Sequence, residues 1–296
     1  MTQPVLVPLP GNEALAIKLA PLLDGEMFVP EMRAFPDGET YFRLDRDLHG
    51  RQVALVCTMD RPDTKFLSLL FAARTVSDLG AASVGLVAPY LAYMRQDRRF
   101  LPGEAITSKL FASFLSPHFD WLVTVDPHLH RIHRLGEVYD VPTRVLHAAP
   151  VIAQWIAREV SKPLLIGPDS ESVQWVDEVA RTTGAAVIVL KKKRQGDQVV
   201  EISQSNMTQW RGFTPVLVDD IISTGHTMIE TVLQLRRAEL TPAVCVGVHG
   251  IFAPGAYEAL VASGPARVVT TDTVRHVSNA IEIATLLADG IREIMT

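Results

Sequence analysis

The sequence predicts an α/β protein made of two similar, doubly wound domains, each built on a parallel β-sheet. Short runs rich in Val, Ile and Leu alternate with segments of helical periodicity, which is typical of parallel strands covered by helices on both faces. The length of 296 residues suggests about two domains. The halves also look alike, because the run 121–126 ends in Asp126 and the run 215–220 ends in Asp219 and Asp220. We therefore expect a duplicated domain.

The expected elements follow one another as strand, helix, strand. The expected strands are residues 52–59, 83–90 and 121–126 in the first half, and 163–167, 185–191, 215–220, 243–248 and 267–271 in the second. The expected helices are residues 64–80, 104–115, 172–184 and 226–239, with one further helix over 278–294 that could pack on either domain. The boundary is expected near residues 146–151. This gives an N-terminal domain of residues 1–147, which the C-terminal helix 278–296 could join, and a C-terminal domain of residues 148–277.

Bulk composition excludes several classes of protein. With 48% hydrophobic and 21% charged residues, the chain has the composition of a soluble globular protein. No segment approaches the ~18 apolar residues of a membrane span, and the N-terminus lacks the pattern of a signal peptide. A net charge of −5 argues against nucleic-acid binding. Cys57 and Cys245 each lie in an apolar run, so we expect buried thiols in a reducing compartment, by default the cytoplasm.

The most informative segment is residues 216–228. An apolar run ends in Asp219 and Asp220, and a short polar loop from Ser223 to Thr227 then opens a helical pattern. Hydroxyl groups and backbone N–H groups at a helix N-terminus favour a phosphate, and the two carboxylates could accept hydrogen bonds from sugar hydroxyls. A phosphorylated sugar fits both halves of the motif. The competing interpretation is a simple helix cap after an ordinary strand.

Five further polar clusters lie at or near expected strand ends, where α/β sheets bind ligands. They are residues 35–39, 89–99, 126–131, 167–172 and 191–197. Each has a plain alternative as a loop, a helix cap or a solvated basic segment. Arginines in the second cluster could grip phosphates, and four successive cations, 191–194, could close on a polyphosphate. His128, His130 and His133 also suggest zinc, which is less favoured than a magnesium site.

Taken together and in this order, the clusters resemble the ribose-phosphate pyrophosphokinase (PRPP synthetase) family over nearly the whole chain, beginning at Gly11-Asn12. The loop at 219–227 resembles the 5-phosphoribosyl 1-pyrophosphate (PRPP) loop of the type I phosphoribosyltransferase fold. The other matching motifs are F-S-D-G-E at 35–39, P-Y-x-x-Y-x-R-Q-D-R at 89–98, E-P-I-T-x-K at 104–109, D-L-H at 126–128, S-P-D at 167–169 and K-x-R at 192–194. Pro36 replaces the usual Ser, and residues 170–172 and 135–142 depart from the family pattern. These departures suggest a divergent branch.

The resemblance implies a role for each matched residue. ATP would be bound by Arg95, Gln96 and Asp97, and by Phe35, Asp37 and Glu39 of a neighbouring subunit. Mg²⁺ would be held by His128 and Asp169, and catalysis would depend on Lys192 and Arg194, with Lys191 or Lys193 as alternatives under a shifted register. Ribose 5-phosphate would be bound by Asp219, Asp220, Ser223, Thr224, Gly225 and Thr227.

The resemblance also implies an activity. The family transfers the β,γ-diphosphoryl group of ATP to ribose 5-phosphate, giving PRPP and AMP, and a shared ATP site implies a homo-oligomer. Two alternatives remain. A phosphoribosyltransferase that consumes PRPP would use the same loop but would have no use for the Phe35 and Arg95 clusters. A PRPP-synthetase-like regulatory subunit would have lost catalysis, which the departure at 170–172 slightly favours.

Overall fold

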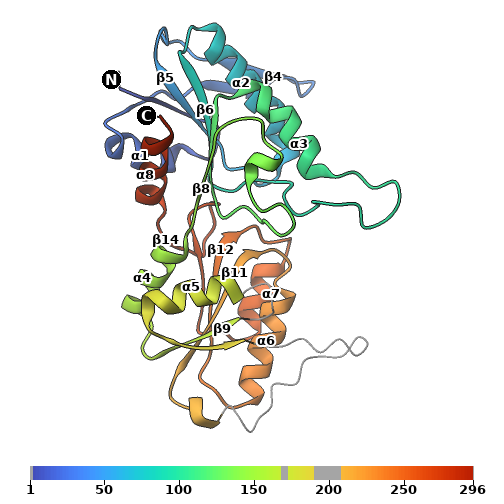
Figure 1. Ribbon diagram of the computed structural model, residues 1–296, viewed down its shortest axis with the longest axis vertical. Helices are drawn as coiled ribbons and strands as arrows, with labels where there is room; N and C mark the ends of the chain where they lie inside the picture. Colours follow the sequence, from blue (N-terminus) through green and yellow to red (C-terminus); the bar gives the residue numbers. More distant parts are fainter. Residues whose placement is uncertain (1–2, 168–172, 190–207, 296) are drawn as a thin grey trace. The chain divides into compact units, whose positions relative to one another are not determined.

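The computed structural model describes residues 3–167, 173–189 and 208–295. The chain divides into two compact units (Figure 1). The first comprises Met1–His147 together with Ala284–Thr296, and the second comprises Ala148–Ile283. Each unit is an α/β domain with a parallel sheet, so the predicted fold class is confirmed. No helix within the described ranges is both long enough and apolar enough to cross a membrane.

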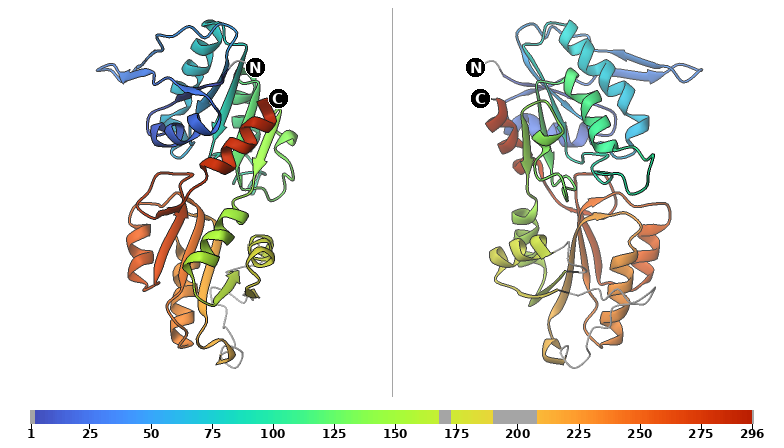
Figure 2. Two further views of the ribbon diagram at one scale, coloured as in Figure 1. Left: turned by 90° about the vertical axis from the view of Figure 1, so that its left-hand side faces the viewer. Right: turned by 45° about the vertical axis from the view of Figure 1, so that its right-hand side comes forward.

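The first unit is built on a six-stranded parallel sheet with the order β2-β1-β5-β6-β7-β8. Its strands are β1 (Val5–Pro8), β2 (Glu26–Met27), β5 (Gln52–Val56), β6 (Ser83–Ala88), β7 (Trp121–Val125) and β8 (Thr143–Leu146). One face carries α1 (Glu13–Leu22) and α8 (Ala284–Met295), and the other carries α2 (Phe66–Asp78) and α3 (Thr107–Leu115) (Figures 1 and 2). Short 3₁₀ turns occur at η1 (Pro62–Thr64), η2 (Ser116–His118) and η3 (Leu135–Glu137).

An antiparallel hairpin, β3 (Glu31–Ala34) and β4 (Thr40–Arg43), projects from the first unit (Figure 2). Most of its residues are exposed or half-buried. The Thr40 hydroxyl lies 3.2 Å from the Ser68 hydroxyl on α2, which ties the base of the hairpin to the domain.

The second unit repeats the plan with the strand order β10-β9-β11-β12-β13-β14. Its strands are β9 (Pro163–Gly167), β10 (Ala186–Val189), β11 (Thr214–Ile222), β12 (Val244–Gly250), β13 (Arg267–Thr271) and β14 (Asn279–Ile281). Helices α4 (Ala149–Glu159) and α5 (Val173–Thr183) lie on one face, and α6 (His226–Arg237) and α7 (Ala256–Ala262) lie on the other (Figure 1). A 3₁₀ turn, η5 (Thr208–Trp210), precedes β11.

Once the hairpin is set aside, the two sheets have the same strand order, because in each the second strand in sequence lies at the edge beside the first. By position in its sheet, β5 corresponds to β11, and β7 corresponds to β13. The expected match between residues 121–126 and 215–220 is therefore wrong. Both runs end in Asp, but a strand's counterpart is decided by its place in the sheet. The counterpart of the β11 loop is the segment after β5, residues 57–65.

The C-terminal segment differs from the single helix expected over 278–294. It begins with strand β14, and α8 starts only at Ala284. The Asn279 side chain holds the strand in place by donating to Thr270 Oγ1 at 2.9 Å and to the Thr271 carbonyl at 2.7 Å. Helix α8 then packs on α1, β7 and β8 of the first unit. Elements β1, β2, β8, α1, α4 and α7 and the hairpin were also not expected.

Both sheets are built mainly from buried apolar residues. Most residues of strands β1, β5 and β11 are buried. Cys57 and Cys245 are buried free thiols, as expected, and burial raises the pKa of each to about 12. Packing between β6 and β7 is especially close. A Cβ atom added at Gly85 would lie 2.0 Å from Trp121 Cε2. Only glycine therefore allows the Trp121 ring to lie flat against β6.

We predict that Gly85→Ala lowers the free energy of unfolding by about 1–3 kcal/mol, because the added methyl group must displace the Trp121 ring in a packed core. Urea denaturation followed by circular dichroism would measure the loss. Gly136→Ala is the matched control, since a Cβ atom there meets nothing within 4 Å and the residue is exposed. Equal stability of the two variants would contradict the packing argument.

Candidate functional site

The loop after β11 forms a cradle at the start of α6. Gly225 adopts a left-handed conformation, with φ 70°, and is the N-cap residue of the helix. No side chain caps the first turn, so its N–H groups face the loop. The hydroxyl groups of Ser223, Thr224 and Thr227 form no hydrogen bond with any described residue. Uncommitted donors at the positive end of a helix dipole favour an anion with several oxygens, such as a phosphate.

Two backbone hydrogen bonds hold this loop against the neighbouring segment after β12. The N–H of Ile251 donates to the Ile222 carbonyl at 3.1 Å, and the N–H of Ala253 donates to the Ser223 carbonyl at 3.0 Å. The loop is thus fixed by its backbone, which leaves its side chains available for a ligand.

Asp219 and Asp220 lie within β11, because the strand continues to Ile222 rather than ending at Asp220. Both side chains are half-buried, and Asp219 Oδ1 accepts the N–H of Asp220 at 3.0 Å. Successive strand residues point to opposite faces of a sheet. The two carboxylates therefore leave the strand in different directions and are not interchangeable.

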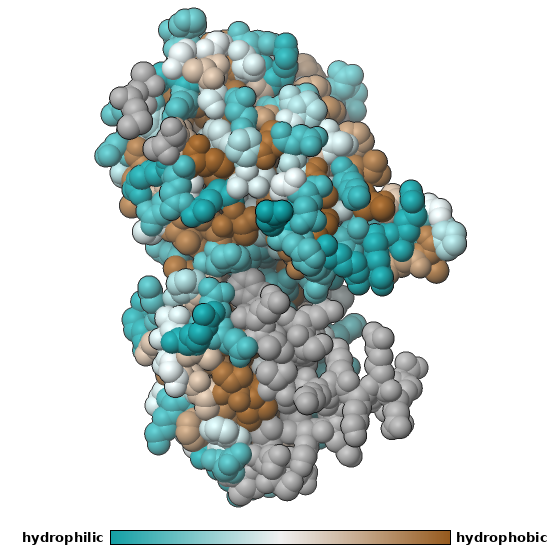
Figure 3. Space-filling view, viewed as in Figure 1, coloured by the Kyte–Doolittle hydropathy of each residue, from teal (hydrophilic) through white to brown (hydrophobic). Residues whose placement is uncertain are grey.

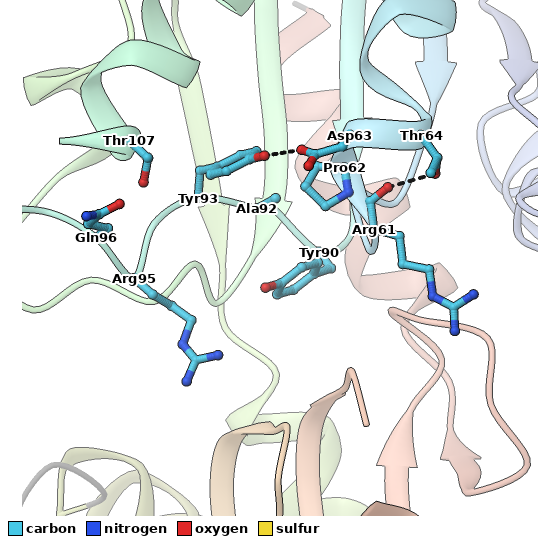
Figure 4. Close-up of a pocket in the computed structure, with 10 residues that line it drawn as sticks. All are labelled: Arg61, Pro62, Asp63, Thr64, Tyr90, Ala92, Tyr93, Arg95, Gln96 and Thr107. Carbon is cyan, nitrogen blue, oxygen red and sulfur yellow. Dashed lines mark hydrogen bonds between the residues drawn. The ribbon is translucent and has the colours of Figure 1, made fainter. Parts of the chain in front are cut away.

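A pocket of about 690 Å³ opens in the first unit at the carboxyl ends of β5 and β6 (Figure 4). It is lined by Arg61, Pro62, Asp63, Thr64, Tyr90, Ala92, Tyr93, Arg95, Gln96 and Thr107. Arg95 and Gln96, both predicted to bind ATP, lie here, and Thr107 begins α3. The Arg61 and Arg95 guanidinium groups form no ion pair or hydrogen bond within the described part of the chain. The pocket therefore presents two uncompensated positive charges.

One wall of the pocket is fixed by a hydrogen bond from the Tyr93 hydroxyl to Asp63 (Figure 4). This bond raises the pKa of Tyr93 above its ordinary value. The Tyr93 ring also packs on Phe111 of α3, with 4.7 Å between ring centroids. Tyr93 has a positive φ of 63°, which a non-glycine residue rarely adopts. The segments after β5 and β6 are thereby joined across the pocket.

Asp97 is held by Arg131 rather than pointing into this pocket. Its carboxylate is 4% exposed and lies 3.0 and 3.3 Å from Arg131 Nη1, while the N–H of Arg131 also donates to it at 3.2 Å. The pair links the segment after β6 to the segment after β7, which carries His128. Asp97 thus ties together two loops predicted to bind ATP and metal.

The loop after β7 begins with a second fixed carboxylate. Asp126 is buried, has a φ of 38°, and lies 2.9 Å from His147 Nδ1. His128 follows two residues later and packs edge-on against His130, with 4.2 Å between ring centroids. Within the described residues, no cluster of three His, Cys, Asp or Glu side chains could hold a metal ion.

Phe35, Asp37 and Glu39 lie on the turn of the β3–β4 hairpin, and none of them lines the pocket of the same chain. The N–H of Phe35 donates to the Glu39 carbonyl at 2.7 Å, and the N–H of Glu39 donates to Asp37 Oδ1 at 3.2 Å. The Arg33 guanidinium lies 4.8 Å from the centre of the Phe35 ring. The turn is well ordered by its own contacts and keeps its aromatic ring partly exposed.

Three predicted residues, Asp169, Lys192 and Arg194, fall outside the described ranges. The pocket also contains residues that were not predicted, namely the segment from Arg61 to Thr64 after β5. This segment could be predicted to bind a ligand only from the order of the strands, because β5 has the same position in its sheet as β11. Of the E-P-I-T-x-K motif, Glu104 has a structural role, accepting the N–H groups of Phe100 and Leu101 at 2.7 and 3.0 Å.

Comparison with known proteins gives consistent matches over both units. The family model described as the N-terminal domain of ribose phosphate pyrophosphokinase matches residues 5–117, and the phosphoribosyl transferase domain model matches residues 135–284. A ribose-phosphate pyrophosphokinase of Methanothermobacter thermautotrophicus is 34% identical, covering 96% of this chain and 98% of that protein. One of Methanopyrus kandleri is also 34% identical, covering 95% and 96%. The crystal structure of phosphoribosylpyrophosphate synthetase from Mycobacterium smegmatis has the same fold, with a TM-score of 0.85, 23% identity and 99% of each chain covered.

We predict that Arg131→Met lowers the free energy of unfolding by about 1–3 kcal/mol, because the nearly buried Asp97 carboxylate loses its charged hydrogen-bond donor. The measurement is urea denaturation near neutral pH. Arg74→Met is the control, since Arg74 pairs with Asp78 at 3.2 Å on the exposed surface of α2 and should contribute less than about 0.5 kcal/mol. A similar small effect for both variants would show that the Asp97 pair is only a surface contact.

Proposed function

The chain belongs to the ribose-phosphate pyrophosphokinase family, and on this basis we propose that it transfers the β,γ-diphosphoryl group of ATP to the anomeric hydroxyl of ribose 5-phosphate, forming PRPP and AMP. One observation carries the proposal: a single chain contains both a phosphate cradle after β11 and a separate pocket with two uncompensated arginines. A transferase that consumes PRPP needs the cradle but has no use for the second pocket.

In this proposal, ribose 5-phosphate is bound by the second unit. The free hydroxyls of Ser223, Thr224 and Thr227 and the open first turn of α6 bind the 5-phosphate. Gly225 allows the left-handed turn, with φ 70°, through which the loop enters α6. Asp219 and Asp220 accept hydrogen bonds from the ribose hydroxyls. Their opposite directions suit two hydroxyl groups better than one.

ATP is bound by the first unit in the same proposal. The Arg95 guanidinium and the Gln96 side-chain amide, which have no partner in the described part of the chain, would bind the phosphates. Asp97 acts through Arg131, holding the two loops in place instead of contacting the nucleotide. This refines the role that the resemblance implies for Asp97.

We also propose a homo-oligomer in which the hairpin turn completes the ATP site of a neighbouring copy. Phe35, Asp37 and Glu39 do not line the pocket of their own chain, and the Phe35 ring is 39% exposed. In addition, four large apolar side chains on α2 and α3 of the first unit, Leu67, Phe71, Leu110 and Phe114, are exposed. Figure 3 shows apolar residues on the surface of the first unit, among hydrophilic ones. Exposed apolar side chains that gather on neighbouring helices are a mark of protein interfaces.

Magnesium is the cofactor that the proposal requires. Mg²⁺ prefers oxygen ligands and usually keeps several waters while binding one or two carboxylates and substrate phosphates. His128 and Asp169 would hold it. Bound there, the ion would neutralise charge on the transferred phosphates.

The chemistry needs mainly alignment of the two substrates and stabilisation of charge on the transferred group. Lys192 and Arg194 would provide that stabilisation in the transition state. The reaction would take place in the cytoplasm, where the free thiols of Cys57 and Cys245 stay reduced.

We predict that the purified protein, supplied with Mg²⁺, ATP and ribose 5-phosphate, forms AMP and PRPP in equal amounts. Separation of the nucleotides by anion-exchange chromatography would measure the products. ADP as the sole nucleotide product would refute diphosphoryl transfer. Absence of any product would support a regulatory subunit instead. Consumption of added PRPP only in the presence of a nucleobase would support a phosphoribosyltransferase.

We predict opposite kinetic effects for two groups of substitutions. Asp220→Ala should weaken ribose 5-phosphate binding about tenfold or more, because a charge-assisted hydrogen bond is lost. Lys192→Ala or Arg194→Ala should lower kcat by far more than it raises KM for ribose 5-phosphate, because these groups act in the transition state. Steady-state kinetics with each substrate varied would distinguish the loss of substrate binding from the loss of kcat. Unchanged binding in Asp220→Ala would remove that residue from the site.

A further inference from the structure

The segment after β5 lies in the first unit where the phosphate cradle lies in the second. Strands β5 and β11 hold the same position in their sheets, and each is followed by a loop that leads into a helix, α2 or α6. In the second unit that loop carries free hydroxyls at a helix start. In the first it is residues 57–65, of which Arg61 to Thr64 line the pocket.

The backbone of Arg61 is held in a left-handed conformation, with φ 51° and ψ 57°. The Thr64 N–H and hydroxyl both bond to the Arg61 carbonyl, at 3.2 and 2.9 Å, and fix this turn. Three consecutive neighbouring strands, β5, β6 and β7, are followed by such a non-glycine residue: Arg61, Tyr93 and Asp126. Residues kept in strained conformations cluster at ligand sites, where the fold holds them for function.

The charges around Arg61 leave its guanidinium unopposed. Lys65 pairs with Asp60, and Tyr93 bonds to Asp63, so both carboxylates of the segment are engaged. The Arg61 guanidinium itself forms no ion pair or hydrogen bond among the described residues. Arg61 and Arg95 both line the pocket, and Figure 4 shows the two side chains on either side of Tyr90, with Arg61 extending away from Arg95. Two free guanidinium groups in one pocket fit a ligand with more than one phosphate.

We propose that Arg61 is a further phosphate-binding residue of the nucleotide pocket, acting with Arg95 on the phosphate chain of ATP. The inference rests on the proposed function, since it takes the ligand of this pocket to be ATP. It extends that function because the segment after β5 would then bind an anion, as the corresponding segment after β11 does in the proposed function.

The experiment measures the binding of ATP with Mg²⁺ by titration calorimetry, without ribose 5-phosphate. Arg61→Gln should weaken ATP binding about tenfold or more, because a charged donor to phosphate is lost. Arg61→Lys should recover part of the affinity, since it restores the charge but not the fork of donors. Arg211→Gln, at an exposed ion pair with Glu239 in the second unit, is the control and should bind ATP like the original protein. Binding of ribose 5-phosphate should stay within about twofold in all variants.

Unchanged ATP affinity in Arg61→Gln would overturn the inference. So would an equal loss in Arg61→Lys accompanied by a lower unfolding temperature, which would mean a structural role. The proposed function is judged separately by AMP formation in the original protein. If that protein binds ATP but forms no AMP, the function fails while the Arg61 comparison still stands. If it does not bind ATP, the nucleotide pocket and this inference both fail.

Discussion

All twelve strands of the two sheets run parallel to their neighbours, and this constraint determines where the chemistry can lie. In a parallel sheet, every carboxyl end lies at the same edge, so the loops that follow the strands gather there. Most strand residues are buried and apolar, so the polar groups that can meet a ligand lie in these loops and near the carboxyl ends of strands, as Asp219 and Asp220 do in β11. The phosphate cradle after β11 and the pocket after β5 and β6 are two outcomes of the same arrangement.

Loops at such an edge must be rigid to be useful, and this chain stiffens them with polar contacts between neighbouring loops. Asn12 Oδ1 accepts the N–H of Thr58 at 2.8 Å, which joins the ends of β1 and β5. Tyr93 with Asp63 joins the segments after β5 and β6, and Asp97 with Arg131 joins those after β6 and β7. These contacts form a continuous chain along the sheet edge. Arg61 and Arg95, whose guanidinium groups have no partner among the described residues, therefore lie on loops that are held in place.

The sequence predicted the parts of the fold whose signal is local. Strands such as β9 and β13 were predicted to the residue, because continuous apolar runs mark buried parallel strands. Strand β14 was missed because its hold on the sheet depends on the Asn279 side chain, which bonds to residues of another segment. The cradle after β11 could be predicted because its hydroxyls, glycine and helix start are contiguous. Asp97 and Arg131 are 34 positions apart, so no local pattern predicts their ion pair. The position of Arg61 beside the pocket follows from the order of the strands in the sheet, which no local pattern contains either.

Helix α8 makes the first domain discontinuous in sequence. Leu287, Ala288 and Ile291 are fully buried, and Gly290 lets the helix approach Leu146 on β8 so closely that a Cβ atom would lie 2.6 Å from it. The second domain is thus an insertion between the last strand and the last helix of the first. During synthesis the ribosome delivers the first sheet early but its covering helix only after the whole second domain. The domain that begins first finishes its core last, and its face for α8 stays uncovered in the nascent chain until then.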